Sequence, residues 1–143
     1  MFQHVYVSTT SWAISHAEMN EVLDASRRNN RVNGVSGLLL HIDRGFLQIL
    51  EGSKAAVAET YARIVCDKRH GGCRVLVEQE IGDRLFGTWS MGYEHLRPSA
   101  SRTSDIFAAV SYALDGIMPP ERAAHIAVLF RDFYRAEMGN RAA

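Results

Sequence analysis

The residues best suited to chemistry in this chain are amides at positions where apolar side chains would be expected. Ser26 and Asn30 continue the inward stripe of a helical pattern, and Asn29 sits at its edge. Gln48 lies inside the apolar run FLQIL. A buried amide without partners costs about 1–3 kcal/mol, so the pattern favours a polar ligand beside these groups. The alternatives are a helix C-cap, which explains one asparagine, and backbone partners for Gln48.

Gln48 is also suited to bridge a phenol and a heteroaromatic ring, because one amide group both donates and accepts hydrogen bonds. Tyr6, on a predicted first strand, is the nearest candidate phenol if its strand neighbours that of Gln48. A tyrosine in a strand ordinarily only packs. Its interest therefore depends on that pairing.

Charged side chains gather at and beyond the end of the second predicted helix, namely Arg63, Asp67, Arg69 and His70. The cations among them could hold a phosphate at the mouth of a groove. A solvated helix end is an equally good explanation. Neither GxGxxG nor GxxxxGK[ST] occurs in the chain, so it has no standard phosphate-binding loop.

Periodicity and capping signals predict the elements that position these residues. Ser15 and Glu18 form a capping box that opens a helix ending at about residue 29 or 30, and Ser53 is the expected N-cap of a second helix. In chain order we expect strand 3–8, helix 16–30, strands 38–42 and 46–50, helix 54–66, strands 74–78 and 89–93, and helices 104–115 and 120–137.

This order of elements, β-α-β-β-α-β-β, predicts an α+β fold, a ferredoxin-like sandwich. Its five-stranded mixed sheet would carry two helices on one face with a groove between them. Trp89 and Met91 would share a face of the last strand, where packing is the commoner role. Arg97-Pro98 marks a boundary, so we expect a domain over 1–97 and a C-terminal helical extension over 98–143.

The composition argues against several classes of function. The 143 residues include 16 Lys and Arg against 16 Asp and Glu, so no global field favours nucleic acid or an anionic membrane. No apolar run approaches a membrane span and the N-terminus does not look like a signal peptide, which predicts a cytoplasmic protein. Cys66 and Cys73 are expected to be free thiols, and no metal site is expected.

The chain resembles the BLUF domain, a flavin-binding sensor of blue light, through a series of short motifs. They follow the family's order and spacing over about residues 1–95, and they are VYVS (5–8), SRRNN (26–30), GVSGLLL (34–40), FLQILEG (46–52), ARI with DKRH (62–70) and FGTWSMG (86–92). Any one of these motifs would be weak, whereas the joint match is specific.

The resemblance implies a flavin whose isoalloxazine ring lies between the two helices. FAD is the usual flavin of the family, with FMN or riboflavin as alternatives. Tyr6 matches the photoactive donor of an electron and a proton, and Gln48 matches the glutamine that reorganises its hydrogen bonds. Trp89 and Met91 match a relay pair. The positions implied in cofactor binding are Tyr6, Ser26, Asn29, Asn30, Gln48, Arg63, Asp67, Arg69 and His70.

The expected function is that of a photoreceptor without catalytic turnover, whose reversible red-shifted state is relayed to a downstream partner protein. We expect a dimer or larger homo-oligomer, and no room after the sensor for a cyclase or phosphodiesterase domain. The last two helices are expected to cover the open face of the sheet rather than bind the partner directly. The alternatives are a light-independent flavin redox protein and a small enzyme of the acylphosphatase type.

Overall fold

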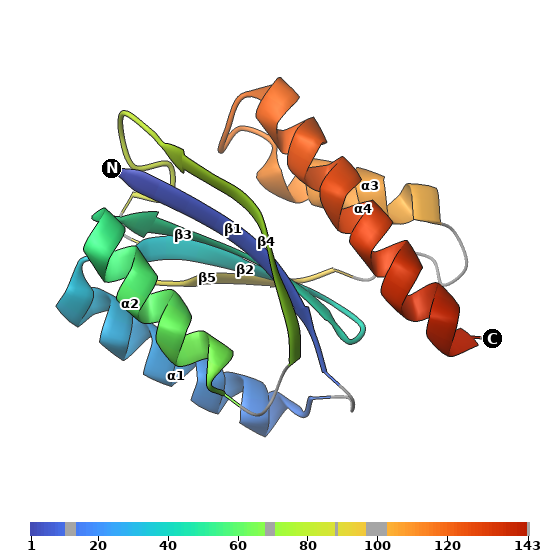
Figure 1. Cartoon of the computed structure of the whole chain (residues 1–143), viewed down its shortest axis with the longest axis horizontal. Helices are drawn as coiled ribbons and strands as arrows, with labels where there is room; N and C mark the ends of the chain where they lie inside the picture. The colour runs from blue at the N-terminus through green and yellow to red at the C-terminus, as the bar shows by residue number, and fades with distance from the viewer. Residues whose placement is uncertain (11–13, 68–70, 88, 97–102, 143) are drawn as a thin grey trace. The chain divides into compact units, whose positions relative to one another are not determined.

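The predicted order of elements is confirmed by the computed structural model, which describes residues 1–10, 14–67, 71–87, 89–96 and 103–142 (Figure 1). The elements are β1 (Phe2–Thr9), α1 (His16–Asn33), β2 (Ser36–Ile42), β3 (Gly45–Gly52), α2 (Lys54–Val65), β4 (Gly71–Glu80), β5 (Gly92–His95), α3 (Thr103–Leu114) and α4 (Pro120–Ala142).

The strands form one five-stranded mixed sheet in the order β4-β1-β3-β2-β5. β1 lies between β3 and β4 and pairs antiparallel with both, and β2 pairs antiparallel with β3. In this register Tyr6 lies opposite Gln48, and Gln48 lies opposite Leu39 on its other side. The first strand and the strand that carries Gln48 are therefore neighbours, as the predicted pairing of Tyr6 with Gln48 requires.

Helix α1 begins at the predicted capping box. The Glu18 amide donates to the Ser15 hydroxyl at 3.1 Å, and the Glu18 carboxylate in turn accepts from the Ser15 backbone. The predicted end at residue 29 or 30 is wrong, because the helix continues to Asn33 and ends at Gly34. Gly34 has φ of +70°, the left-handed conformation that ends a helix most cheaply in glycine. Asn29 and Asn30 are therefore inside the helix, and the Asn30 carbonyl accepts from the Gly34 amide at the cap.

Helix α2 begins at Ser53, whose hydroxyl accepts from the Ala56 amide at 3.2 Å, as predicted. Figure 1 shows α1 and α2 lying side by side across one face of the sheet, which confirms the ferredoxin-like arrangement. The core between the helices and the sheet is built from Tyr6, Met19, Leu23, Val35, Leu39, Phe46, Leu50, Val57 and Met91. Val65, the last residue of α2, is 48% exposed.

Several strand boundaries differ from the predicted ones. β1 begins one residue earlier and ends one residue later than expected, and it is buried on both faces from Gln3 to Thr9. β4 extends over Gly71–Glu80 because it pairs along nearly the whole of β1. β5 begins only at Gly92, three residues later than expected.

The chain divides into two compact units, Met1–Glu94 and His95–Ala143. The second unit consists of α3 and α4, which pack against each other through buried side chains such as Val110, Leu114 and Phe130. No helix among the described residues is long and apolar enough to cross a membrane. Cys66 and Cys73 are free thiols, as expected.

Candidate functional site

The site is built around one hydrogen bond between adjacent strands. The Tyr6 hydroxyl donates to Oε1 of Gln48, and both side chains are buried. Side chains alternate along a strand, so residues opposite each other in the register project to the same face. That face is the one covered by α1 and α2. The pairing of phenol and amide predicted from the sequence is therefore present.

The environment of Tyr6 keeps its phenol protonated. Burial raises the pKa of Tyr6 well above its ordinary value, and the acidic groups of Cys73, Tyr61 and Asp67 raise this pKa further. The ring of Tyr61 packs edge-on against that of Tyr6, with 5.0 Å between centroids. Removing an electron from a phenol makes its proton strongly acidic. Gln48 Oε1 is already placed to receive that proton.

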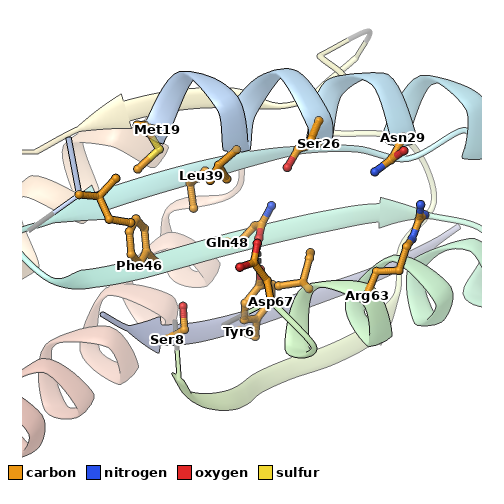
Figure 2. Close-up of a pocket in the computed structure, with 14 residues that line it drawn as sticks. Tyr6, Ser8, Met19, Ser26, Asn29, Leu39, Phe46, Gln48, Arg63 and Asp67 are labelled. Carbon is orange, nitrogen blue, oxygen red and sulfur yellow. Dashed lines mark hydrogen bonds between the residues drawn. The ribbon is translucent and has the colours of Figure 1, made fainter. Parts of the chain in front are cut away.

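A pocket opens in front of this pair, between the two helices, with a volume of about 160 Å³ (Figure 2). Its walls are mainly apolar, and they come from both helices and from the middle of the sheet. The residues that line it are Tyr6, Ser8, Ile14, Met19, Val22, Ala25, Ser26, Asn29, Leu39, Phe46, Gln48, Arg63, Ile64 and Asp67.

The polar residues predicted on α1 reach this pocket in different ways. Ser26 and Asn29 line it directly, on the side opposite α2 (Figure 2). Asn30 is buried and lines a smaller cavity with Ser26, Asn29 and Gln48. Its Nδ2 donates to the carbonyl of Ser90 at 2.6 Å. The Asn30 amide is thus engaged on one side by the protein backbone.

Two of the four charged residues predicted at the mouth of the groove lie in the described part of the chain. Arg63, near the end of α2, and Asp67, just beyond it, both line the pocket. Arg63 is an exposed residue, so its guanidinium can meet a ligand group that extends out of the pocket. Arg69 and His70 lie outside the described residues.

The predicted placement of Trp89 and Met91 on one face of the fifth strand is wrong, since both precede β5. The backbone here is bonded to other parts of the chain, and the carbonyl of Trp89 accepts from the Gly37 amide at 3.1 Å. Trp89 is 51% exposed, whereas Met91 is 3% exposed and its sulfur accepts from Nε2 of Gln48 at 3.4 Å. Only Met91 touches the candidate site.

Some pocket residues were not singled out from the sequence, although the strand period could have found them. Ser8 lies two residues after Tyr6, and Phe46 lies two residues before Gln48, so each shares the face of its neighbour. Leu39 needed the strand pairing, which places it opposite Gln48. The pocket matches a planar ring with polar edges, because apolar walls surround a buried amide that retains bonding capacity.

Comparison with known structures places the fold among light-regulated proteins. The dark-state structure of BlrB, a BLUF protein, matches with a TM-score of 0.67 and 25% identity, covering 92% of this chain and 95% of that one. A bacterial light-regulated adenylyl cyclase matches with a TM-score of 0.66 and 27% identity, over 92% of this chain and 39% of the cyclase.

Among curated proteins, the photoactivated adenylate cyclase subunit beta of Euglena longa is 36% identical over 80 residues. That match covers 56% of this chain and 9% of the cyclase subunit. The chain thus spans about a tenth of the curated relatives it matches, and cyclase activity is a property of those proteins.

A family model described as BLUF, sensors of blue-light using FAD, matches residues 1–92. This span contains β1 to β4, both helices of the pocket, the Tyr6–Gln48 pair and Met91. With pocket, fold and family model in agreement, the chain belongs to the BLUF family of blue-light sensors.

Proposed function

We propose that this chain is a photoreceptor in which a flavin bound between α1 and α2 senses blue light through Tyr6 and Gln48. The bonded pair of Tyr6 and Gln48 facing the pocket is the observation that carries the proposal. The bound flavin would supply absorption of blue light and an excited state that accepts an electron. FAD is the flavin named in the family description, and Arg63 and Asp67, which line the pocket, would meet the part of the cofactor beyond its ring.

Tyr6 would supply the electron, and its proton would pass along the existing hydrogen bond to Oε1 of Gln48. The protonated amide would pass a proton from Nε2 to the flavin that has taken the electron, which changes its tautomer, and the neutral group could then also rotate. Either change alters which atom Gln48 presents to the pocket and to Met91. When the electron and the proton return to Tyr6, the amide can remain in its second arrangement. Two discrete arrangements of one amide make a reversible switch.

The geometry favours a binding role over catalysis. The matched span is a sensor, and the pocket presents no nucleophile beside a base among its described residues. A sensor needs a receiver, so we propose a downstream partner protein whose binding differs between the two arrangements. The relatives that are cyclases illustrate one kind of receiver, joined to the sensor in the same chain.

The test is an absorption spectrum of the purified protein loaded with FAD, recorded in darkness, under blue light and again in darkness. A hydrogen bond that is stronger by about 1 kcal/mol in the excited state moves a blue band by roughly 10 nm to the red. We expect a shift of that size which reverses in darkness, without bleaching.

Two other results would contradict the proposal. Bound flavin that never shifts, but bleaches with a reductant, would indicate a light-independent redox protein. A protein that stays colourless after FAD, FMN and riboflavin have each been added would exclude a flavin site altogether. Chromatography of the flavin released from protein purified without added cofactor identifies which of the three it retains.

A further inference from the structure

The segment that leads into β5 is held by side chains of α1. Nε of Arg27 donates to the carbonyl of Met91 at 3.0 Å, and Nδ2 of Asn30 donates to the carbonyl of the preceding residue, Ser90, at 2.6 Å. Hydrogen bonds from a charged donor are roughly twice as strong as neutral ones. Arg27 is therefore the stronger of the two attachments by its chemistry.

Arg27 faces this segment rather than the pocket. It follows Ser26 by one residue, which turns it about 100° around the helix axis. Ser26 lines the pocket and Arg27 does not. Within the described part of the chain, the Arg27 guanidinium has no carboxylate partner, so its bond to Met91 is not a by-product of a surface ion pair.

Met91 is held at both ends. Its carbonyl is bonded to Arg27, and its buried sulfur accepts from Nε2 of Gln48. A sulfur accepts hydrogen bonds only weakly and has no proton to give in return. If the Gln48 amide turns so that its oxygen faces the sulfur, two acceptors meet and that attachment is lost. The bond from Arg27 to the Met91 carbonyl, together with that from Asn30 to Ser90, then limits how far the Met91 backbone moves.

We infer that Arg27 is a positioning residue that holds Met91 in register with the switching amide and so sets the lifetime of the lit state. This inference rests on the proposed function. With the Met91 backbone anchored, the sulfur stays close to Gln48 and favours return of Nε2 to its dark position. Without that anchor the segment relaxes, and the lit arrangement lasts longer.

The experiment compares Arg27→Ala, Arg27→Lys and the control Arg28→Ala in the full chain loaded with FAD. Arg28 is the adjacent arginine, and it is exposed. We expect Arg27→Ala to bind flavin and to shift under light as the wild type does, but to recover in darkness about threefold to tenfold more slowly. Arg27→Lys keeps a charged donor, so its dark recovery should be nearly as fast as that of the wild type. Arg28→Ala should recover at the wild-type rate.

A second readout distinguishes positioning from a merely structural role. Methionine labelled with ¹³C at the carbonyl carbon should give an isotope-sensitive band in the light-minus-dark infrared spectrum. In Arg27→Ala this band should move to higher wavenumber, because the Met91 carbonyl has lost its donor. Global loosening of the fold would not select this carbonyl.

The inference is overturned if Arg27→Ala recovers at the rate of Arg28→Ala, or if its labelled carbonyl band is unmoved. It is also overturned if Arg27→Ala and Arg27→Lys both lose flavin, since Arg27 would then serve cofactor binding. Failure of the proposed function is a separate result, because the wild type itself would then show no light-induced shift.

Discussion

At the scale of single residues, the site depends on two buried polar side chains that satisfy each other. The Tyr6 hydroxyl donates a hydrogen bond to Oε1 of Gln48, and Nε2 of Gln48 donates to the sulfur of Met91. Burial of such groups is tolerated only when they are bonded. The pair is therefore rigid in each arrangement, and a change of one bond requires a change in the other. This coupling suits a switch better than either residue would alone.

Replacing Tyr6 by Phe should separate flavin binding from switching. The change leaves the ring in place but removes the donor to Gln48, at a cost of about 1–2 kcal/mol. We expect a yellow protein that no longer shows the reversible red shift, measured by absorption before and during blue light.

Tyr61→Phe is the matched control, because Tyr61 packs against Tyr6 without bonding to Gln48. That variant should keep both the flavin and the shift. A normal photocycle in Tyr6→Phe would contradict the donor role assigned to Tyr6.

The raised pKa of Tyr6 predicts a switch that is insensitive to alkali. Since burial holds the pKa above its ordinary value of 10.0, Tyr6 should stay protonated between about pH 7 and pH 10. The amplitude of the red shift should be constant over this range. The raised pKa of Tyr6 also lowers the stability of the fold at high pH. Above pH 10 an unfolded tyrosine loses its proton while Tyr6 retains it, so this contribution to folding is lost as the pH rises toward the folded pKa.

Spectra recorded along an alkaline titration of the folded protein test this prediction. A parallel thermal unfolding series should show the melting temperature falling above pH 10. Loss of the red shift well below that pH, with the flavin still bound, would show that the phenol ionises earlier than its burial implies.

At the scale of elements, a second buried polar group holds the loop before Met91. Glu51, at the end of β3, is fully buried, and its carboxylate accepts from the amides of Leu85 and Phe86 at 2.9 and 2.8 Å. It also accepts from the Ser36 hydroxyl, at 2.8 Å. Arg84 bonds both Ser36 and the carbonyl of Gly34, each at 2.7 Å. The loop is thus tied to β2, to β3 and to the end of α1.

Removing this carboxylate should cost stability without touching the pocket. Glu51→Ala leaves several donors unsatisfied, for a loss of about 3 kcal/mol in the free energy of unfolding, or about 10 °C in melting temperature for a chain of this length. Thermal unfolding followed by circular dichroism measures it. Glu59→Ala, on the exposed side of α2, should leave the melting temperature nearly unchanged, and equal effects from the two variants would refute the anchoring role of Glu51.

The sequence predicts the elements better than it predicts their ends. Capping residues mark helix starts, and Ser15 and Ser53 were identified for that reason. The sequence predicts too early an end for α1, because Asn29 resembles a cap although Gly34 provides it. Residues 89–93 alternate as a strand would, yet Trp89 and Met91 precede β5. Their carbonyls bond to Gly37 and Arg27, more than 50 residues earlier, and no local pattern encodes such contacts.

The site follows the same rule. The polar residues on one strand face or one helix stripe, such as Gln48 and Ser26, could be found from periodicity. The partner of Gln48 required knowledge of which strands adjoin, which the register supplies. Arg27 and Glu51 were not singled out, because a charged residue in a helix or at a strand end is ordinarily solvated. Only the packed structure shows what they hold.

At the scale of the whole molecule, the chain divides into a sensor unit and a C-terminal helical unit. Every described residue that lines the pocket belongs to the unit Met1–Glu94. The other unit contributes two helices with a shared apolar core. The face of the sheet opposite the pocket is apolar, since Val5, Val7, Leu47 and Ile49 alternate with the pocket residues of β1 and β3. An apolar sheet face of this extent needs a cover.

A chain shortened to residues 1–97 tests the domain boundary and the expected role of the extension together. The shortened chain should still bind flavin and shift under blue light, because the Tyr6–Gln48 pair and its pocket are retained. If α3 and α4 serve as the cover, as their apolar stripes predict, the shortened chain exposes its sheet face and self-associates. Size-exclusion chromatography should then show a larger species than the full chain gives. A shortened chain of unchanged association state would refute the covering role, whereas loss of flavin binding would refute the boundary itself.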